Sequence, residues 1–270
     1  MLIRLAMWLC VVSPPFKRLL WRRWYQYLAG YRQADWRFMN YGYTAPGADE
    51  PELPLQPEDE PNRYSIQLYH RVASAVPLAG LDVLEVGSGR GGGASFVKRY
   101  HQPRQLTGVD FSAKAVSFCQ GQHRLEGLSF VAGDAESLPF DDESFDAVLN
   151  VESSHCYGSM SNFLAQVRRV LRPGGHFLFA DLRSAADRER LQRDIENSGM
   201  TILEQEEITE NVVAALRCES ARKLALIEKS VSQPLQYAFR QFAAVEGSEV
   251  YEGFRTGATV YLRYLLQKVK

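Results

Sequence analysis

The sequence lacks the features that mark disulfide scaffolds, zinc proteins and membrane-spanning helices. Its 4 cysteines are scattered over 270 residues and form no CxxC pair, so we expect reduced thiols in a cytoplasmic protein and no metal site. They are Cys10, Cys119, Cys156 and Cys218. The apolar run Leu2 to Val12 is interrupted by Arg4 and is shorter than the roughly 20 residues of a membrane-spanning helix. A formal net charge of -1 also argues against electrostatic binding to nucleic acid.

The N-terminal segment, residues 1–30, contains no acidic side chain, and the first acid of the chain is Asp35. Apolar residues from Phe16 to Tyr31 recur at helical spacing with Lys and Arg between them, which predicts a basic amphipathic helix. Such a helix could make peripheral contact with an anionic membrane surface, or it could pack as a lid over the rest of the protein. A secretory signal is a further alternative for Leu2 to Val12, but no small-residue cleavage site follows this run.

Residues 44–62 contain no basic side chain but are rich in acids and prolines, which is the composition of a loop or linker. This loop could be a solvated tether or a substrate gate. The next stretch, Arg63 to Val76, has the apolar spacing of a helix, with Asn62 as its expected cap. We therefore divide the chain into residues 1–76, a helical extension with an acidic proline-rich loop and lid, and residues 77–270, an α/β domain with a lid insertion at about 207–250.

Strand patterns alternate with helix patterns beyond this point, which is typical of a parallel sheet covered by helices on both faces. The expected strands are Leu81–Val86, Gln105–Asp110, Leu128–Ala132, Phe145–Val151, Gly175–Ala180, Thr201–Glu206 and Ala258–Leu266. The expected helices include Ala113–Gln120, Ala186–Asn197 and Ile208–Leu216, with Tyr237–Glu246 as part of the lid. Val250 and Tyr251 are expected to begin the run into the last strand. We predict an α/β, Rossmann-like fold with a seven-stranded, mostly parallel sheet, an antiparallel last strand, and a helical N-terminal extension and lid.

The first expected strand, Leu81–Val86, leads directly into a cluster of glycines. Such a strand-to-helix turn lets a ligand approach the backbone closely. The spacing of Gly87, Gly89 and Gly92 also fits a nicotinamide dinucleotide site, so the glycines alone leave the ligand open. Glu85 favours a cation, because a carboxylate beside the turn repels a pyrophosphate. We therefore expect S-adenosylmethionine, which carries an ammonium and a sulfonium and has no phosphate.

A carboxylate stands at the end of the second expected strand, where Asp110 lies about 20 residues beyond the glycines. An acid at that place accepts hydrogen bonds from both hydroxyls of a ribose. The alternative role for Asp110 is to cap the following helix, although Ser112 could equally supply that cap. We expect Asp110 to bind the ribose.

The turn from Glu85 to Gly91 resembles the first motif of class I S-adenosylmethionine-dependent methyltransferases, and Gly133-Asp134-Ala135 is similar to the Gly-Asp-Ala of that family. The resemblance implies that Asp134 accepts the adenine amino group and that the backbone N–H of Ala135 donates to the ring. The expected cofactor-binding residues are Glu85, Gly87, Ser88, Gly89, Gly91, Asp110, Phe111, Asp134, Ala135 and Asn150.

The exit of the fourth expected strand, Asn150 to Tyr157, should border the methyl donor and its acceptor, because ligands of open α/β sheets lie beyond the carboxyl ends of the strands. His155 is our candidate general base, since imidazole accepts protons near neutral pH. Asp181, at the exit of the fifth strand, is the alternative base or the partner that orients His155. Either side chain could instead cap a helix or pack under a loop. A sulfonium is already activated, so a base is helpful but dispensable.

The chain from about residue 15 resembles methyltransferases that act on large natural products, and in particular bacterial phthiotriol/phenolphthiotriol dimycocerosate O-methyltransferases. The stretches that carry this likeness are Asn62-Arg63, Leu68–Arg71, Gly91–Ser95 and Ser154–Tyr157. The resemblance implies O-methylation of a hydroxyl on a bulky apolar natural product or lipid, with S-adenosylhomocysteine as the second product. The alternatives are a C- or N-methyltransferase on a polyketide, sterol or terpenoid-like acceptor, a nicotinamide-dependent oxidoreductase, and a membrane-binding module with a vestigial cofactor site.

Overall fold

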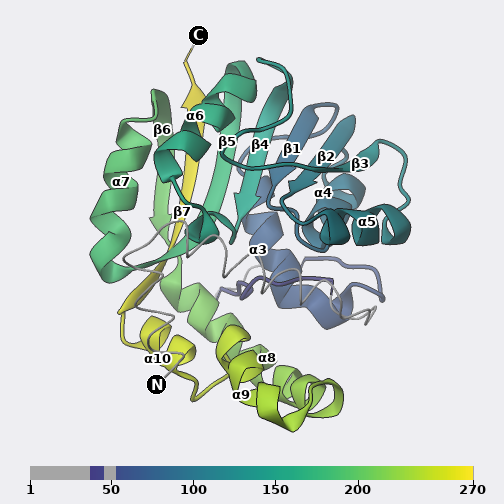
Figure 1. Cartoon of the computed structure of the whole chain (residues 1–270), viewed down its shortest axis with the longest axis vertical. Helices are drawn as coiled ribbons and strands as arrows, with labels where there is room; N and C mark the ends of the chain where they lie inside the picture. The colour runs from purple at the N-terminus through teal and green to yellow at the C-terminus, as the bar shows by residue number, and fades with distance from the viewer. Residues whose placement is uncertain (1–36, 46–52, 270) are drawn as a thin grey trace.

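The structure is a computed structural model of the chain, and it describes residues 37–45 and 53–269. The predicted basic helix, the Leu2 to Val12 run and part of the acidic loop lie outside the described residues. A single sheet of seven strands forms the centre, in the order β3-β2-β1-β4-β5-β7-β6 (Figure 1). Its strands are β1 Asp82–Val86, β2 Gln105–Asp110, β3 Leu128–Ala132, β4 Phe145–Val151, β5 Leu171–Ser184, β6 Met200–Glu207 and β7 Thr259–Lys268.

The sheet is parallel from β3 to β5, and β7 runs antiparallel to both of its neighbours, β5 and β6. The predicted fold class is therefore confirmed. Strand β5 is longer than the predicted Gly175–Ala180 at both ends. It extends because Leu171 pairs with Phe145 of β4 and Ser184 pairs with Thr259 of β7.

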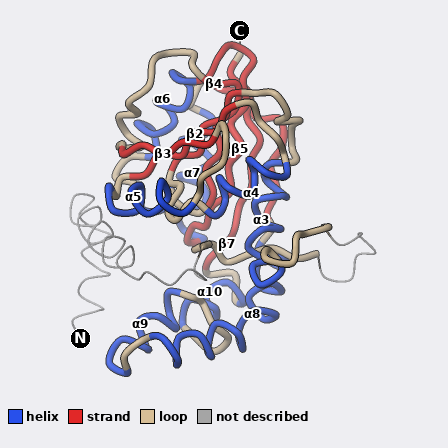
Figure 2. Tube along the Cα trace, turned by 90° about the vertical axis from the view of Figure 1, so that its right-hand side faces the viewer, coloured by secondary structure: helices blue, strands red, loops and turns tan. Residues whose placement is uncertain are grey.

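Helices cover both faces of the sheet (Figures 1 and 2). They are α3 Arg63–Ala73, α4 Gly92–Tyr100, α5 Ala113–Gln122, α6 Met160–Val170 and α7 Arg188–Glu196. Alternate residues of a strand point to opposite faces, and in β1 Val83 packs in the cluster under α3, α4 and α5, while Leu84 packs with α6 and α7. Both side chains are fully buried. This arrangement leaves the carboxyl ends of the parallel strands open at one edge of the sheet.

Three further helices gather below the sheet in Figure 1, and they are α8 Thr209–Ser230, α9 Gln233–Phe242 and α10 Glu249–Arg255. Helices α8 and α9 enclose a small apolar cluster of their own, Ile227, Val231, Phe239 and Val245. The predicted helix Ile208–Leu216 is the first part of α8, and the predicted lid segment Tyr237–Glu246 overlaps α9.

Val250 and Tyr251, which were expected to begin the run into the last strand, lie in α10 instead, and β7 begins at Thr259. The hydroxyl of Ser248 caps this helix by accepting a hydrogen bond from the Tyr251 N–H at 3.1 Å. Tyr251 and Phe254, three residues apart, are both buried on one face of the helix. The Ser248 cap and the spacing of Tyr251 and Phe254 are both signals of a helix.

Asn62 occupies the N-cap position of α3, as predicted, but its side chain makes no capping hydrogen bond. A short 3-10 helix, Glu60–Asn62, leads into α3 instead, and α3 ends at Ala73. Within the described part of the chain, no helix is long and apolar enough to cross a membrane.

Candidate active site

The backbone of the turn after β1 is held in place by neighbouring strands. The N–H groups of Gly87 and Ser88 donate to the Val109 carbonyl at 2.8 Å and 3.1 Å. Gly87 has a φ of +77°, and a Cβ at this position would lie 2.3 Å from the Ser153 hydroxyl oxygen. Only glycine fits there without strain. The turn therefore packs against the exit of β4. The predicted cofactor-binding turn thus lies next to the loop that carries His155.

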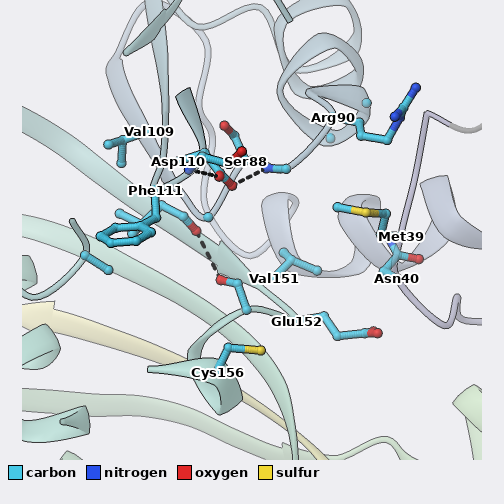
Figure 3. A pocket seen from close by; sticks show the side chains of 18 of the residues that line it. Met39, Asn40, Ser88, Arg90, Val109, Asp110, Phe111, Val151, Glu152 and Cys156 are labelled. Carbon is cyan, nitrogen blue, oxygen red and sulfur yellow. Dashed lines mark hydrogen bonds between the residues drawn. The ribbon is translucent and has the colours of Figure 1, made fainter. Parts of the chain in front are cut away.

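An open cavity lies beyond the turn, and we call it the cofactor cavity. Its walls come from the turn, from the ends of β2, β3 and β4, and from residues 37–40 (Figure 3). Of the predicted cofactor-binding residues, those on its wall are Gly87, Ser88, Gly89, Asp110, Phe111, Asp134 and Ala135.

Asp110 is fixed on this wall by two backbone hydrogen bonds. Its Oδ2 accepts from the Gly89 N–H at 2.8 Å, and its Oδ1 accepts from the Ser112 N–H at 2.8 Å. Burial raises the pKa of this carboxyl, although both hydrogen bonds favour the carboxylate. The cap of α5 is the Ser112 hydroxyl, which accepts from the Ala115 N–H at 3.3 Å. Helix capping therefore does not require the Asp110 side chain.

The adenine end of the predicted site is formed by the turn after β3 and by Phe111. Asp134 Oδ1 accepts a hydrogen bond from the Glu136 N–H at 3.0 Å, which fixes the turn. Phe111 is 46% exposed although it is a large aromatic residue, and it borders the cavity (Figure 3). An exposed ring at the rim of a cavity is available to stack on a planar ligand.

Three residues that were predicted to bind the cofactor do not line the cavity, and they are Glu85, Gly91 and Asn150. Glu85 is buried behind the turn, where its Oε1 accepts a hydrogen bond from the Tyr69 hydroxyl at 2.7 Å. Burial raises the pKa of Glu85 to about 7, and the Tyr69 hydrogen bond opposes this rise. Asn150 is buried as well, and its amide donates to the Ser153 hydroxyl at 2.7 Å. These residues support the wall from behind.

His155 and Asp181 meet, as the sequence predicted for an orienting pair. The distance from His155 Nδ1 to Asp181 Oδ1 is 2.8 Å, and the His155 N–H donates to Oδ2 at 2.8 Å. Asp181 is fully buried and also accepts from the Ser154 hydroxyl at 2.6 Å, while Arg183 lies 3.1 Å away. Neither His155 nor Asp181 is on the wall of the cofactor cavity.

This pairing determines the charge on the imidazole. Burial would lower the pKa of His155, but Cys156 and the Asp181 carboxylate outweigh burial and raise the pKa to about 10. The pKa of Asp181 is lowered, because His155 and Arg183 outweigh the effect of its burial. The pair with Asp181 therefore favours the protonated imidazolium, which is the form that does not accept a proton.

Glu152 is a residue of the site to which sequence reasoning gave no role. It follows β4 with a φ of +51°, which is uncommon for a residue with a side chain and is typical of functional sites. Its Oε2 accepts from the Tyr41 N–H at 2.9 Å and from the Tyr261 hydroxyl at 3.0 Å. Burial raises the pKa of Glu152 to about 8. Glu152 lines the cofactor cavity with Cys156, opposite Asp110 (Figure 3).

Residues 37–43 form a second part of the site that was missed, and we call this segment the strap. Asn40 anchors the strap, since its side chain donates to the Ser65 carbonyl at 3.1 Å. Met39 faces the cavity, and a Cβ added at Gly89 would lie 2.6 Å from the Met39 methyl carbon. The aromatic composition of the segment was visible in the sequence, but its position across the glycine turn was not.

Comparison with known proteins places the chain in a family. The family model described as "Methyltransferase domain" matches residues 84–179. A phthiotriol/phenolphthiotriol dimycocerosates methyltransferase from Mycobacterium tuberculosis is 42% identical over 255 residues, which cover 94% of this chain and 93% of the relative. The chain belongs to this methyltransferase family.

Further methyltransferases of the family and of the fold agree with this assignment. A fatty-acid O-methyltransferase from Mycolicibacterium smegmatis is 42% identical over 234 residues, which cover 86% of this chain and 83% of the relative. A putative sarcosine dimethylglycine methyltransferase from Galdieria sulphuraria has the same fold, with a TM-score of 0.69 at 16% identity, covering 92% of this chain and 98% of that one. The chain is therefore an S-adenosylmethionine-dependent methyltransferase.

The residues of the cofactor cavity fit this methyl donor. The glycine turn leaves space that a Cβ would fill, and the Asp110 carboxyl is held at the wall of the cavity. Among the described residues, no group of three or more His, Cys, Asp or Glu side chains is placed to hold a metal ion.

Proposed function

We propose that this methyltransferase moves the methyl group of S-adenosylmethionine to an oxygen atom of a large hydrophobic natural product or lipid. The names of its relatives support an oxygen acceptor on a lipid, because one acts on phthiotriol and phenolphthiotriol dimycocerosates and another is a fatty-acid O-methyltransferase. The observation in the structure that carries the proposal is the cofactor cavity, in which a site for a nucleoside adjoins a space bordered by Met39, Glu152 and Cys156.

In this proposal Asp110 binds the two ribose hydroxyls, and Asp134 with the Ala135 N–H binds the adenine. Phe111 borders the same part of the cavity. The glycine turn, with Ser88, receives the amino-acid part of the donor, while Glu85 and Asn150 hold the turn from behind. The donor supplies a methyl group that its sulfonium already activates, so the protein mainly has to align the acceptor oxygen and exclude water.

For His155 and Asp181 we propose a positioning role. The general-base role predicted for His155 needs a neutral ring, and the pair favours an imidazolium. The same pair fixes the backbone of the loop after β4, because Asp181 accepts hydrogen bonds from the His155 N–H and the Ser154 hydroxyl. That loop presents Glu152 and Cys156 to the cavity.

Calorimetry and product analysis test the proposed function. S-adenosylhomocysteine should bind, and NAD should not; binding of NAD alone would overturn the donor assignment. Incubation with methyl-labelled donor and a lipid extract, followed by mass spectrometry, should give O-methylated products. Labelled C-methyl or N-methyl products in place of these would make the chain a methyltransferase of another atom.

Three features predicted from the sequence stay predictions. They are a cytoplasmic location, a role of residues 1–30 as a lid or as a peripheral membrane contact, and the division of the chain at residue 76. Liposome flotation of the whole chain and of a variant that lacks residues 1–30 tests the contact. We expect flotation of the whole chain only. Flotation of neither protein, or of both, would remove this role from the segment.

A further inference from the structure

Glu152 lines the cofactor cavity, and the protein holds one of its two carboxyl oxygens. Its Oε2 accepts hydrogen bonds from the Tyr41 N–H at 2.9 Å and from the Tyr261 hydroxyl at 3.0 Å. Within the described part of the chain, no residue donates a hydrogen bond to the other oxygen, Oε1. A carboxylate accepts hydrogen bonds at both oxygens. Oε1 is therefore the oxygen that can meet a ligand in the cavity.

The backbone of Glu152 is fixed in an unfavourable conformation. Its φ of +51° lies in the left-handed region, which costs a residue with a side chain about 1 to 2 kcal/mol. The Glu152 N–H donates to the Ala180 carbonyl of β5 at 2.8 Å. Together with the bonds to its side chain, this contact fixes Glu152 by the strap, β5 and β7. Strained backbone that several elements hold in place is typical of functional sites.

A second cavity adjoins the cofactor cavity at the strap, and we call it the helical cavity. It lies between the strap, α3, α8 and α9, and it shares Phe38, Met39 and Asn40 with the cofactor cavity. Tyr41, whose N–H holds Glu152, lines the helical cavity. The apolar side chains on its wall from α8 and α9 are Leu226, Ile227, Phe239 and Phe242. The strap thus connects Glu152 to a cavity that suits the apolar part of an acceptor.

The surroundings of Glu152 bring its pKa close to the pH at which a protein works. Burial raises this pKa to about 8, while the Tyr41 and Tyr261 hydrogen bonds and the charge on His155 oppose the rise. About a tenth of such carboxyl groups are carboxylates at pH 7. In the same cavity, the carboxylate would be further stabilised by the positive charge of the donor. A general base is most effective when its pKa lies near the working pH.

The other titratable groups near Glu152 are less suited to take a proton from an acceptor. Asp181 is paired with His155, and this pair favours the imidazolium. Lys223 of α8 lines the helical cavity only. The tyrosines of the strap, α3 and β7 have pKa values raised by burial and stay protonated, and they are Tyr41, Tyr69 and Tyr261.

The remaining groups on the wall of the cofactor cavity have other places in the site. The proposed donor-binding acid Asp110 lies across the cavity from Glu152 (Figure 3). Glu136 belongs to the turn after β3, where its Oε1 accepts from the Gly158 N–H at 2.8 Å. The Cys156 thiol lies on the same side as Glu152 and raises the pKa of His155. A carboxyl group on the side away from Asp110 is thus provided by Glu152.

We propose that Glu152 is the general base of methyl transfer, and that its Oε1 takes the proton of a hydroxyl group on the acceptor. This inference rests on the proposed function. As the proton passes to Oε1, the hydroxyl oxygen attacks the methyl carbon, a new O–CH₃ bond forms, and the S–CH₃ bond breaks with its electron pair left on sulfur. The products are a methyl ether, S-adenosylhomocysteine and protonated Glu152, which then releases the proton to water. His155 and Asp181 hold the loop that carries this carboxylate.

Three variants test this inference. Glu152→Gln keeps the size of the side chain without the base, Glu152→Asp keeps a base on a shorter side chain, and Glu210→Gln is the control. Glu210 is exposed at the start of α8 and lines neither cavity. The acceptor mixture is the lipid extract of the product analysis above, with methyl-labelled donor at saturation. The product followed from pH 6 to 9.5 is the labelled methyl ether that the wild type forms.

We expect the maximal rate of the wild type to rise with pH and to level off, with an apparent pKa at or below about 8. Glu152→Gln should lower the maximal rate by roughly 100-fold or more and remove this rise, because a general base contributes about that much. Glu152→Asp should keep the rise at an intermediate rate, and Glu210→Gln should match the wild type. The extract concentration at half the maximal rate should stay within about threefold in Glu152→Gln, since the base acts in the transition state. Calorimetry with S-adenosylhomocysteine should give the same affinity in every variant, which shows that each one folds.

Three results would overturn the inference while leaving the proposed function intact. They are a maximal rate of Glu152→Gln within about threefold of the wild type, the same pH dependence in both proteins, and methyl esters without methyl ethers from the wild type. Failure of the wild type to bind S-adenosylhomocysteine, or labelled C-methyl or N-methyl products alone, would instead overturn the proposed function.

Discussion

The cofactor cavity and the helical cavity adjoin each other, but they are built from different parts of the fold. The cofactor cavity is formed by strand ends and by a turn held through backbone hydrogen bonds, such as the one from the Gly87 N–H to the Val109 carbonyl. The helical cavity is formed largely by side chains of α8 and α9, which enclose only a small apolar cluster. Backbone geometry is common to all members of a fold, whereas side chains differ between them. We therefore expect the cofactor cavity to be general to the fold and the cavity between α8 and α9 to be particular to this chain.

The largest effect should come from the cofactor cavity. Asp110→Ala removes the carboxylate that holds the Gly89 N–H and is proposed to bind the ribose. Hydrogen bonds to a charged group contribute about 1.5 to 3 kcal/mol each, so we expect the affinity for S-adenosylhomocysteine to fall by roughly 100-fold in calorimetry. Asp110→Asn keeps the size of the side chain and should lose less. A change below about threefold in Asp110→Ala would separate this carboxylate from donor binding.

A second effect concerns the loop after β4, which lines the cofactor cavity. The pKa of His155 is raised in the folded state to about 10, from about 6.5 in an unfolded chain. The protonated His155 ring then contributes fully to the free energy of unfolding below about pH 6.5. This contribution is lost as the pH rises toward 10, by at most about 1.4 kcal/mol per pH unit. Asp181 has a lowered pKa, so its contribution is lost in acid, below about pH 4.

Urea unfolding of the wild type and of His155→Gln from pH 6 to 10 measures this contribution. The difference in unfolding free energy between the two proteins should shrink as the pH rises. The comparison of two proteins removes the effect of other groups that titrate in this range, such as Glu152. A difference that stays constant over the range would show that the His155 ring is neutral in the folded protein.

A smaller effect should appear at Glu152, which lines the cofactor cavity. The pKa of Glu152 is raised to about 8, so at pH 9 it is largely a carboxylate that attracts the sulfonium of S-adenosylmethionine. Glu152→Gln stays neutral. Between pH 7 and 9 the affinity for S-adenosylmethionine in calorimetry should therefore rise about fivefold more in the wild type than in the variant, for an attraction of roughly 1 kcal/mol. Equal pH profiles would mean that ionisation of Glu152 does not affect the donor.

The smallest effect should come from the contact between the glycine turn and the strap. In Gly89→Ala the new Cβ would meet the flexible end of Met39 at 2.6 Å, and the φ of +52° adds a cost of about 1 to 2 kcal/mol. We expect a few-fold loss of affinity for S-adenosylhomocysteine. The double variant with Met39→Ala should recover the part caused by the contact. If the double variant binds S-adenosylhomocysteine no better than Gly89→Ala, the whole loss of affinity is due to backbone strain.

The sequence predicted the strands and the wall residues of the cofactor cavity because their signals are local. Each of these signals lies directly after the strand that positions it. They are the glycines after β1, Asp110 at the end of β2 and the Gly133–Ala135 turn after β3. Parallel strands then bring their carboxyl ends to one edge of the sheet. The meeting of His155 with Asp181 followed from the same rule, since β4 and β5 are neighbours in the sheet.

The surroundings of Glu152 and the helical cavity could not be predicted in this way, because their residues meet through long-range packing. Tyr41 reaches Glu152 across 111 residues of sequence, and no local pattern indicates that contact. Lys223 lies beyond the predicted helix Ile208–Leu216, in the part of α8 to which the sequence gave no role. Lys223 lines a cavity together with Phe239 and Phe242 of α9, and neither this neighbourhood nor the positive φ of Glu152 follows from a local pattern.

The position of β7 has a consequence for how the protein is made. Residues 259–268 lie between β5 and β6 in the sheet, so β6 has no strand to pair with until β7 is present. During synthesis from the N-terminus, the parallel part of the sheet can assemble while β6 and α8 wait for these last residues. Contacts between segments far apart in sequence slow folding. We infer that pairing of β7 is a late step of folding. At this step the helices that follow β6 join the parallel part of the sheet.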